Sequence, residues 1–165
     1  MIFDPKLLDQ LQSLDPTPWA GQAYRYIVGE NLPTKANTRG ARWNPPSVAA
    51  IYTALDRETL LAELDYRLSL DVVRPKEIFA YTISIELHNV LDLTPPGVLA
   101  DVGLSMDELG DIDYRRCQEV GGAVDWLEHD GLLVPSARAD GSNLVVFPTN
   151  QHAEAVFEVL SEEQL

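Results

Sequence analysis

Cysteine and histidine are scarce in this sequence, and their scarcity excludes most disulfide and metal chemistry. The 165 residues include one cysteine, Cys117, which has no intrachain partner for a disulfide. We expect Cys117 to be a small core residue, with a reactive thiol as the alternative. The three histidines, His88, His129 and His152, are too far apart for a common metal-binding motif, and one cysteine cannot form a zinc cluster. The sequence therefore predicts no metal site.

Long apolar runs are also missing. No stretch approaches the ~20 apolar residues of a membrane-spanning helix, and the first six residues lack the basic-then-apolar order of a signal peptide. A chain of 165 residues is about the size of one domain. We therefore expect a single cytoplasmic domain that does not bind a membrane.

Positive charge is the third scarcity, since 12 Lys and Arg residues against 26 Asp and Glu residues give a net charge of -14. Sequence-independent binding to nucleic acid depends on Lys and Arg at phosphates, so we expect no direct nucleic-acid binding. Residues 20–46 are the exception, with four bases and one acid: Arg25, Lys35, Arg39, Arg42 and Glu30. This stretch suits a small anion such as a pyrophosphate group. A solvated loop with chance charges is the alternative.

Local patterns predict a mixture of helices and strands. Apolar residues at helical spacing predict helices at residues 1–17, after the N-cap residue Asp56, at residues 115–129, and in the acidic tail from Gln151. β-branched and aromatic residues predict strands at residues 23–28, 49–54, 78–90, 132–134 and 143–147. This arrangement is typical of one α+β domain whose central sheet is flanked by helices.

One acid stands out on the helix that follows Asp56. Leu60, Leu64 and Leu68 recur every four residues and predict the buried stripe of this helix. Glu63 lies about 60° from Leu60 around the helix axis, at the edge of the stripe, where a side chain can face a cleft. A surface ion pair with Arg67, four residues later, fits the helix geometry equally well.

Three motifs share a spacing with a known family. The run Gly40-Ala41-Arg42-Trp43-Asn44-Pro45-Pro46 is followed by Tyr52 ten residues after Arg42, by Glu63 twenty-one residues after Arg42, and by Ser136 in Val134-Pro135-Ser136. Between about Tyr24 and Pro148 the sequence resembles the RES domain. That family is named for an arginine, a glutamate and a serine, which here are Arg42, Glu63 and Ser136.

Further matches to the family are scattered between these motifs. They comprise Arg25 and Tyr26 in Tyr24-Arg25-Tyr26, Asn143 before the last predicted strand, and Gln118 with Gly121 as Gln-x-x-Gly. One departure is Phe147-Pro148, where many relatives have Asn-Pro.

The resemblance implies a fold and an activity. The fold is a strongly twisted sheet similar to that of ADP-ribosyltransferases, with a core at about residues 20–150, an N-terminal helical arm and an acidic C-terminal helix. The activity is that of a bacterial toxin that depletes NAD by hydrolysis or by phosphorolysis. NAD is then a substrate, phosphate is a co-substrate in the second case, and no cofactor is needed. The partner is a helix-turn-helix antitoxin of the Xre type.

The resemblance also distributes roles among the residues. Cleavage of the bond between nicotinamide and ribose passes through an oxocarbenium-like transition state. Nicotinamide leaves as a neutral molecule, so no general acid is needed. Glu63 is expected to stabilise the developing positive charge, with Arg42 and Tyr52 as the other catalytic residues. Substrate binding falls to four residues: Arg25, Tyr26, Ser136 and Asn143.

Two other functions remain open at the level of sequence. A protein ADP-ribosyltransferase would use the same bond cleavage, but many such enzymes have a second acid near the first, and the residue two positions before Glu63 is Leu61. A catalytically silent module that only binds a partner is the alternative from a different class. Ser136 has no histidine in a suggestive position to act as its base, so we interpret it as a hydrogen-bonding residue rather than a nucleophile.

Overall fold

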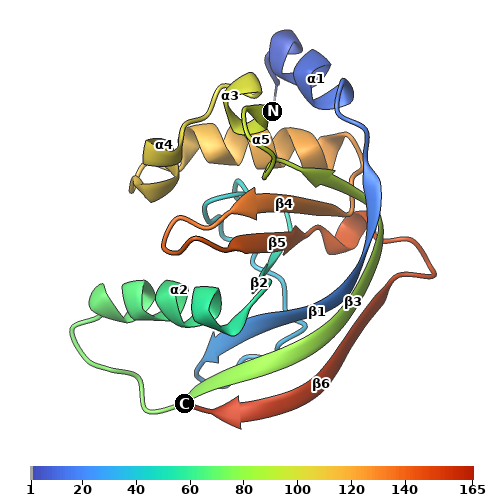
Figure 1. Ribbon diagram of the computed structural model, residues 1–165. Coiled ribbons are helices and arrows are strands. Elements are labelled where there is room, and N and C mark those ends of the chain that lie inside the picture. The colour runs from blue at the N-terminus through green and yellow to red at the C-terminus, as the bar shows by residue number, and fades with distance from the viewer. Residues whose placement is uncertain (1) are drawn as a thin grey trace.

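Three long strands and three short ones form the sheet of this protein, which a computed structural model describes over residues 2–165 (Figure 1). The strands are β1 (Thr17–Val28), β2 (Ile51–Ala54), β3 (Ile78–Asp92), β4 (Gly131–Pro135), β5 (Ser142–Val146) and β6 (Val156–Gln164). The helices are α1 (Pro5–Gln12), α2 (Arg57–Ser69), α3 (Val98–Asp101), α4 (Met106–Gly110), α5 (Arg115–Trp126) and the 3-10 turn η1 (Pro148–Asn150). The α+β class predicted from the sequence is confirmed.

The long strand β3 organises the sheet because it pairs with three other strands. The strand order is β1-β2-β5-β4-β3-β6, and an additional antiparallel pairing between β1 and β3 closes five of the six strands into a ring. The C-terminal end of β3 pairs in parallel with β4, whereas its N-terminal part lies between β1 and β6. Its length is what allows the sheet to bend round on itself, as Figure 1 shows for the curved β1, β3 and β6.

Two apolar cores lie on the two sides of the β4–β5 hairpin. One core joins α1, α3, α4 and α5 to the hairpin, with Leu11, Leu109 and Val124 packed near Leu132 and Val145. The other core lies inside the ring of strands and joins β1 and β3 to β5. Helix α2 covers the side of the hairpin opposite α5 (Figure 1).

Cys117 belongs to the first of these cores. Its side chain is 1% exposed, and burial raises the pKa of the thiol to about 11. The prediction of a small core residue is therefore confirmed.

The prediction for the C-terminal tail was wrong. Residues 156–164 form strand β6, not a helix, and pair antiparallel with β3 along the register Phe157↔Ile85 and Val159↔Ile83. The pattern of apolar residues suited either structure. The open edge of β3 decides the outcome, because it satisfies the backbone hydrogen bonds of the tail and receives Phe157 against the core inside the ring.

The N-terminal prediction was partly wrong. Helix α1 ends at Gln12, and the chain from Thr17 is already strand β1, paired with β3 from Thr17↔Val90 onwards. The predicted strand at residues 23–28 is the second half of a longer strand. The segment 92–110, for which no structure was predicted, contains α3 and α4. No helix of residues 2–165 is both long and apolar enough to cross a membrane.

Candidate functional site

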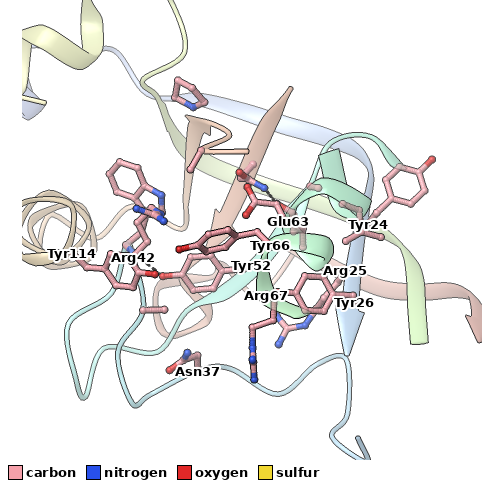
Figure 2. A pocket seen from close by; sticks show the side chains of 18 of the residues that line it. Tyr24, Arg25, Tyr26, Asn37, Arg42, Tyr52, Glu63, Tyr66, Arg67 and Tyr114 are labelled. Atoms are coloured by element: carbon pink, nitrogen blue, oxygen red, sulfur yellow. Dashed lines mark hydrogen bonds between the residues drawn. The ribbon is translucent and has the colours of Figure 1, made fainter. Parts of the chain in front are cut away.

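A cavity of about 390 Å³ opens between β1, β2, α2 and the loop that carries Arg42. This volume lies within the range of small-molecule sites. Six of the seven predicted site residues line it: Arg25, Tyr26, Arg42, Tyr52, Glu63 and Asn143. In Figure 2, Arg42 and Tyr114 lie on one side of the cavity, Arg25 and Tyr26 lie on the other, and Glu63 and Arg67 lie between the two sides.

Ser136, the seventh residue, lies behind Glu63 and is 2% exposed. Its Oγ donates a hydrogen bond to Oε1 of Glu63 at 2.7 Å and accepts hydrogen bonds from the backbone N–H groups of Arg138 and Ala139 at 3.1 and 3.2 Å. A hydroxyl with all three contacts occupied is suited to orienting the carboxylate rather than to binding a substrate. Ser136 therefore contacts Glu63 directly, and its predicted contact with the substrate stays a prediction.

The start of α2 fixes Glu63 relative to this serine. Asp56 caps the helix by accepting from the backbone N–H of Thr59 at 2.7 Å. The turn between β4 and β5 lies directly on this cap, since a Cβ added to Gly141 would be 1.9 Å from Oγ1 of Thr59. Only glycine permits that approach, which places Ser136 and Glu63 at a fixed separation.

Arg67 does not form an ion pair with Glu63, which was the alternative that the helix geometry allowed. Its Nη1 instead donates to Oδ1 of Asp71 at 2.7 Å. Leu60 and Leu64 are buried as predicted, whereas Leu68 is only partly buried. Glu63 lies beside this stripe and lines the cavity. The interpretation of Glu63 as a cleft residue is the one that the geometry favours.

The loop that carries Arg42 is held by a network centred on Tyr52. The phenol of Tyr52 accepts from the backbone N–H of Trp43 at 2.8 Å and donates to Oδ1 of Asn44 at 2.7 Å. Asn44 is fully buried and donates to the carbonyl of Val48 at 2.8 Å. Burial raises the pKa of Tyr52, so the phenol stays protonated. Its ring lines the cavity while its hydroxyl shapes the loop.

Helix α5 supports the same loop from behind. Nε2 of Gln118 donates to the carbonyl of Ala41 at 2.9 Å. A Cβ on Gly121 would lie 1.7 Å from the carbonyl oxygen of Trp43. The Gln-x-x-Gly motif therefore has a structural meaning, because it seats the loop backbone on α5 and so positions Arg42.

Arg42 itself is held at the mouth of the cavity. Its Nη1 donates to the carbonyl of Asp111 at 3.2 Å, and its guanidinium lies 4.5 Å from the ring centroid of Tyr114. A carbonyl and an aromatic face do not neutralise the charge, so Arg42 remains available to an anion.

Arg25 is the most exceptional charged group of the site. Its Nη2 donates to the carbonyl of Lys35 at 2.9 Å, but Nε and Nη1 are buried and have no hydrogen-bond partner among residues 2–165. Burial lowers the pKa of Arg25 to about 10, against a smaller opposite effect of Tyr26. A buried guanidinium with two unused nitrogen donors is the expected signature of a site for an anionic ligand.

Tyr26 lies close to most of the charged groups of the cavity. Burial raises its pKa, and the Glu63 carboxylate raises it further, whereas Arg67 and Arg25 act in the opposite direction. Asn143, on β5, lines the cavity and donates from Nδ2 to the carbonyl of Thr53 at 3.2 Å. The structure thus brings the predicted cavity residues together from five separate segments, which are β1, the loop that carries Arg42, β2, α2 and β5.

Some cavity residues were not predicted as site residues from the sequence. Tyr66 and Arg67 follow Glu63 by three and four residues on α2, so helix periodicity carried a signal for both. Tyr114 and Asn37 lie in loops and had no such signal. Arg138 does not line the cavity, but its guanidinium lies 3.3 Å from the ring centroid of the lining residue Tyr66.

The charge of the cavity is opposite to that of the chain. Three arginines and one carboxylate line it, a balance of +2 within a protein of net charge -14. Among the described residues that line it, Glu63 is the one acid, and there is no histidine or lysine. Residues 2–165 hold no cluster of three or more potential metal ligands.

The site of this α+β domain combines one fixed carboxylate with a cationic cavity. Such a site is suited to an anionic substrate that contains a glycosidic bond. The chain belongs to the RES domain family, whose model matches residues 6–165. It is 31% identical over 157 residues to the NAD(+) phosphorylase MbcT of Mycobacterium bovis and to that of Mycobacterium tuberculosis, covering 87% of this chain and 81% of those proteins.

A solved structure has the same fold. The crystal structure of the M. tuberculosis MbcT–MbcA toxin–antitoxin complex matches with a TM-score of 0.86 at 26% identity. The match covers 98% of this chain and 93% of the matched one, so the arm α1 and the edge strand β6 belong to the shared fold.

Proposed function

We propose that this protein is the toxin of a toxin–antitoxin pair and depletes NAD by cleaving its nicotinamide–ribose bond, with inorganic phosphate as the acceptor. The observation that carries the proposal is Glu63, held by Ser136 at 2.7 Å on the wall of a cationic cavity. The relatives named as NAD(+) phosphorylases support the substrate and the acceptor.

Glu63 supplies the electrostatic part of the reaction. As the bond from the ribose C1″ to the nicotinamide nitrogen lengthens, positive charge grows on the ribose ring, and a nearby carboxylate stabilises it. The bonding electrons return to the nicotinamide ring, which leaves neutral. The bond from the phosphate oxygen to C1″ forms, and the products are nicotinamide and ADP-ribose 1″-phosphate.

The residue inventory of the cavity suits phosphate better than water. A water molecule must lose a proton to complete the reaction and benefits from a general base. Phosphate attacks through an oxygen that is already deprotonated. Since Glu63 is the one acid among the described lining residues and its Oε1 is engaged by Ser136, a cavity with a single carboxylate is sufficient for phosphorolysis.

The remaining residues bind the dinucleotide. Arg25 and Arg42 hold the pyrophosphate through charge-assisted hydrogen bonds, which satisfies the buried Nε and Nη1 of Arg25. The rings of Tyr26 and Tyr52 provide apolar surface for nicotinamide and ribose. Asn143 lies within the same wall and is suited to a ribose hydroxyl.

We propose the partner and the setting from the family resemblance. The antitoxin covers the cavity mouth, and we propose that it is a helix-turn-helix protein of the Xre type, which supplies the basic DNA-binding surface that this acidic chain lacks. The toxin acts in the cytoplasm, where NAD is present. The twisted sheet around the cavity is proposed to be related to that of ADP-ribosyltransferases.

The test is incubation of the purified protein with NAD in the presence and absence of phosphate, followed by identification of products by mass spectrometry. We expect nicotinamide and ADP-ribose 1″-phosphate, formed at a rate that depends on phosphate. ADP-ribose formed at the same rate in both buffers would mean a hydrolase. Labelled protein, instead of free products, would mean a transferase.

A further inference from the structure

The cavity contains one cation more than the dinucleotide requires. The pyrophosphate of NAD carries two negative charges, which Arg25 and Arg42 match. Arg67 is the third arginine that lines the cavity. Its ordinary interpretation is a half-exposed surface ion pair with Asp71, worth little to stability. Its position in the cavity wall gives it a more specific role.

From this position we infer that Arg67 binds the acceptor phosphate and thereby makes the enzyme a phosphorylase rather than a hydrolase. The inference rests on the proposed function. Glu63 and Arg67 are four residues apart on α2, so their side chains lie on the same face, with Cβ atoms about 5–6 Å apart. An anion held by Arg67 therefore lies within reach of the ribose carbon that Glu63 stabilises, as the near-attack distance of about 3–3.5 Å requires.

Electrostatics gives a reason why such a cation is needed. The Glu63 carboxylate, which lowers the barrier for breaking the bond, also repels an approaching phosphate, and like charges a few ångströms apart repel more strongly in a cavity than in water. Water has no charge and meets no such repulsion. Arg67 offsets this repulsion for phosphate alone. Tyr26, Glu63 and Arg67 line the same cavity, and the charges of both Glu63 and Arg67 act on the pKa of Tyr26 in opposite directions.

The pairing with Asp71 does not remove Arg67 from this role. Only Nη1 is bonded to Asp71, and the side chain is 47% exposed, so its other donors are free to face the cavity. Figure 2 shows Arg67 between Arg25 and Tyr26 on one side and Arg42 and Tyr114 on the other.

The experiment measures the KM values for phosphate and for NAD separately, using protein made by cell-free synthesis because expression is expected to arrest growth. Arg67→Gln should raise the KM for phosphate by about tenfold or more, the effect of one lost charge-assisted hydrogen bond. The KM for NAD should change less than about threefold. At fixed phosphate, the products should shift from ADP-ribose 1″-phosphate toward ADP-ribose.

The matched control is Arg57→Gln. Arg57 lies on the same helix and is also bonded to an acid, with Nη1 at 2.5 Å from Glu163, but it does not line the cavity. The Arg57→Gln substitution should leave the KM values for phosphate and for NAD unchanged. If Arg67→Gln does not fold, as judged by circular dichroism, Arg67→Met keeps the aliphatic stem and carries the same test.

Three results would overturn the inference. The KM for NAD could rise while the KM for phosphate stays constant, which would place Arg67 at the pyrophosphate. Both KM values could stay unchanged, which would leave Arg67 a surface ion pair. The Arg57 variant could show the same rise as the Arg67 variant. Failure of the proposed function looks different, because the wild-type protein would then cleave no NAD or show no dependence on phosphate.

Discussion

At the scale of single residues, Arg25 carries a charge that the protein does not fully accommodate without a ligand. Two of its nitrogen donors are buried and lack a partner among residues 2–165. Such a group costs free energy in the unliganded protein, which is consistent with the proposed role of Arg25 in binding an anion. The same argument does not apply to Tyr52, Ser136 or Asn143, because none of them has a buried polar side-chain atom without a hydrogen bond among residues 2–165.

Replacing Arg25 should therefore affect NAD binding and the stability of the fold in different ways. We expect Arg25→Met to leave the free energy of unfolding unchanged or to increase it by about 1–2 kcal/mol, because an unpaired buried charge is removed. Binding of NAD should be lost. Urea unfolding measures the first quantity, and calorimetric titration of NAD in a Glu63→Gln background measures the second.

The control for this prediction is Arg39→Met, an exposed arginine of the same basic stretch that does not line the cavity. It should alter neither quantity. An Arg25→Met protein that still binds NAD with unchanged affinity contradicts the assignment of Arg25 to the pyrophosphate.

Ser136 is expected to act through Glu63 and not on the substrate. Ser136→Ala removes the 2.7 Å hydrogen bond to Oε1 of Glu63 and leaves two backbone N–H groups without an acceptor. We expect kcat to fall about tenfold or more and the free energy of unfolding to fall by about 1–3 kcal/mol. The KM for NAD should change little. Steady-state kinetics would contradict this role if the KM rose and kcat did not change.

A serine elsewhere in the protein provides the comparison. Ser161→Ala changes an exposed serine of β6, far along the chain from the cavity residues. Its kcat and stability should stay near those of the wild-type protein. An equal loss of kcat in both variants would mean that the effect is not specific to Glu63.

The sequence could predict which residues gather at the site better than it could predict what each does there. Glu63, Arg42 and Arg25 stood out by motif and by local charge, and the structure brings them to one cavity. The place of Ser136 behind the carboxylate depends on a turn that meets α2 through Gly141, a contact between segments about 80 residues apart that no local pattern encodes.

At the scale of elements, α5 is the support of the loop that carries Arg42. Gly121 touches this loop so closely that a Cβ would lie 1.7 Å from the carbonyl oxygen of Trp43, in contact with backbone that has little freedom to move. Its neighbour Gly122 is less crowded, with the nearest atom, Cγ of Pro45, at 3.2 Å. The two adjacent glycines form a matched pair for mutagenesis.

We expect Gly121→Ala to lower the free energy of unfolding by about 3 kcal/mol or to displace the loop, since overpacking of a rigid contact costs about 1–3 kcal/mol or more. Gly122→Ala should cost less than about 1 kcal/mol. Thermal or urea unfolding measures both, and NAD cleavage reports displacement of Arg42. Equal effects of the two substitutions would contradict the close contact as the reason for Gly121.

Local patterns predicted the helices and strands that bury one face against the core. They failed for segments whose structure depends on pairing with another strand. Apolar and polar residues alternate in the strand at residues 78–90, and the strand at residues 143–147 is a mostly continuous apolar run. Both strands were predicted near their true limits. The tail at residues 156–164 and the start of β1 form strands because β3 offers them an edge on each side. Tertiary context overrides propensity in such edge strands.

At the scale of the whole molecule, an acidic protein surrounds a basic cavity. The net charge of -14 leaves the three cavity arginines as an isolated positive site. A field of this shape attracts a small anion to the cavity and disfavours nucleic acid elsewhere on the surface. A partner that covers the cavity mouth would switch the activity off without a change in the fold of the toxin.

The cellular prediction follows from this arrangement. Expression of this chain alone should arrest bacterial growth and lower the NAD concentration, and co-expression with its antitoxin should restore both. Growth curves and extraction of nicotinamide nucleotides measure the two effects. Growth arrest with a constant NAD concentration would point to a silent module that acts through a partner.

The most direct test of the central claim compares the wild-type protein with Glu63→Gln in the presence of NAD and phosphate, measuring nicotinamide released and phosphate consumed. Gln keeps the shape of the side chain and removes its charge, so turnover should fall by at least about a hundredfold while circular dichroism stays the same. In the wild-type reaction, one phosphate should be consumed for each nicotinamide released. Turnover of the folded Gln variant within a few-fold of wild type, or release of nicotinamide without consumption of phosphate, would contradict the account.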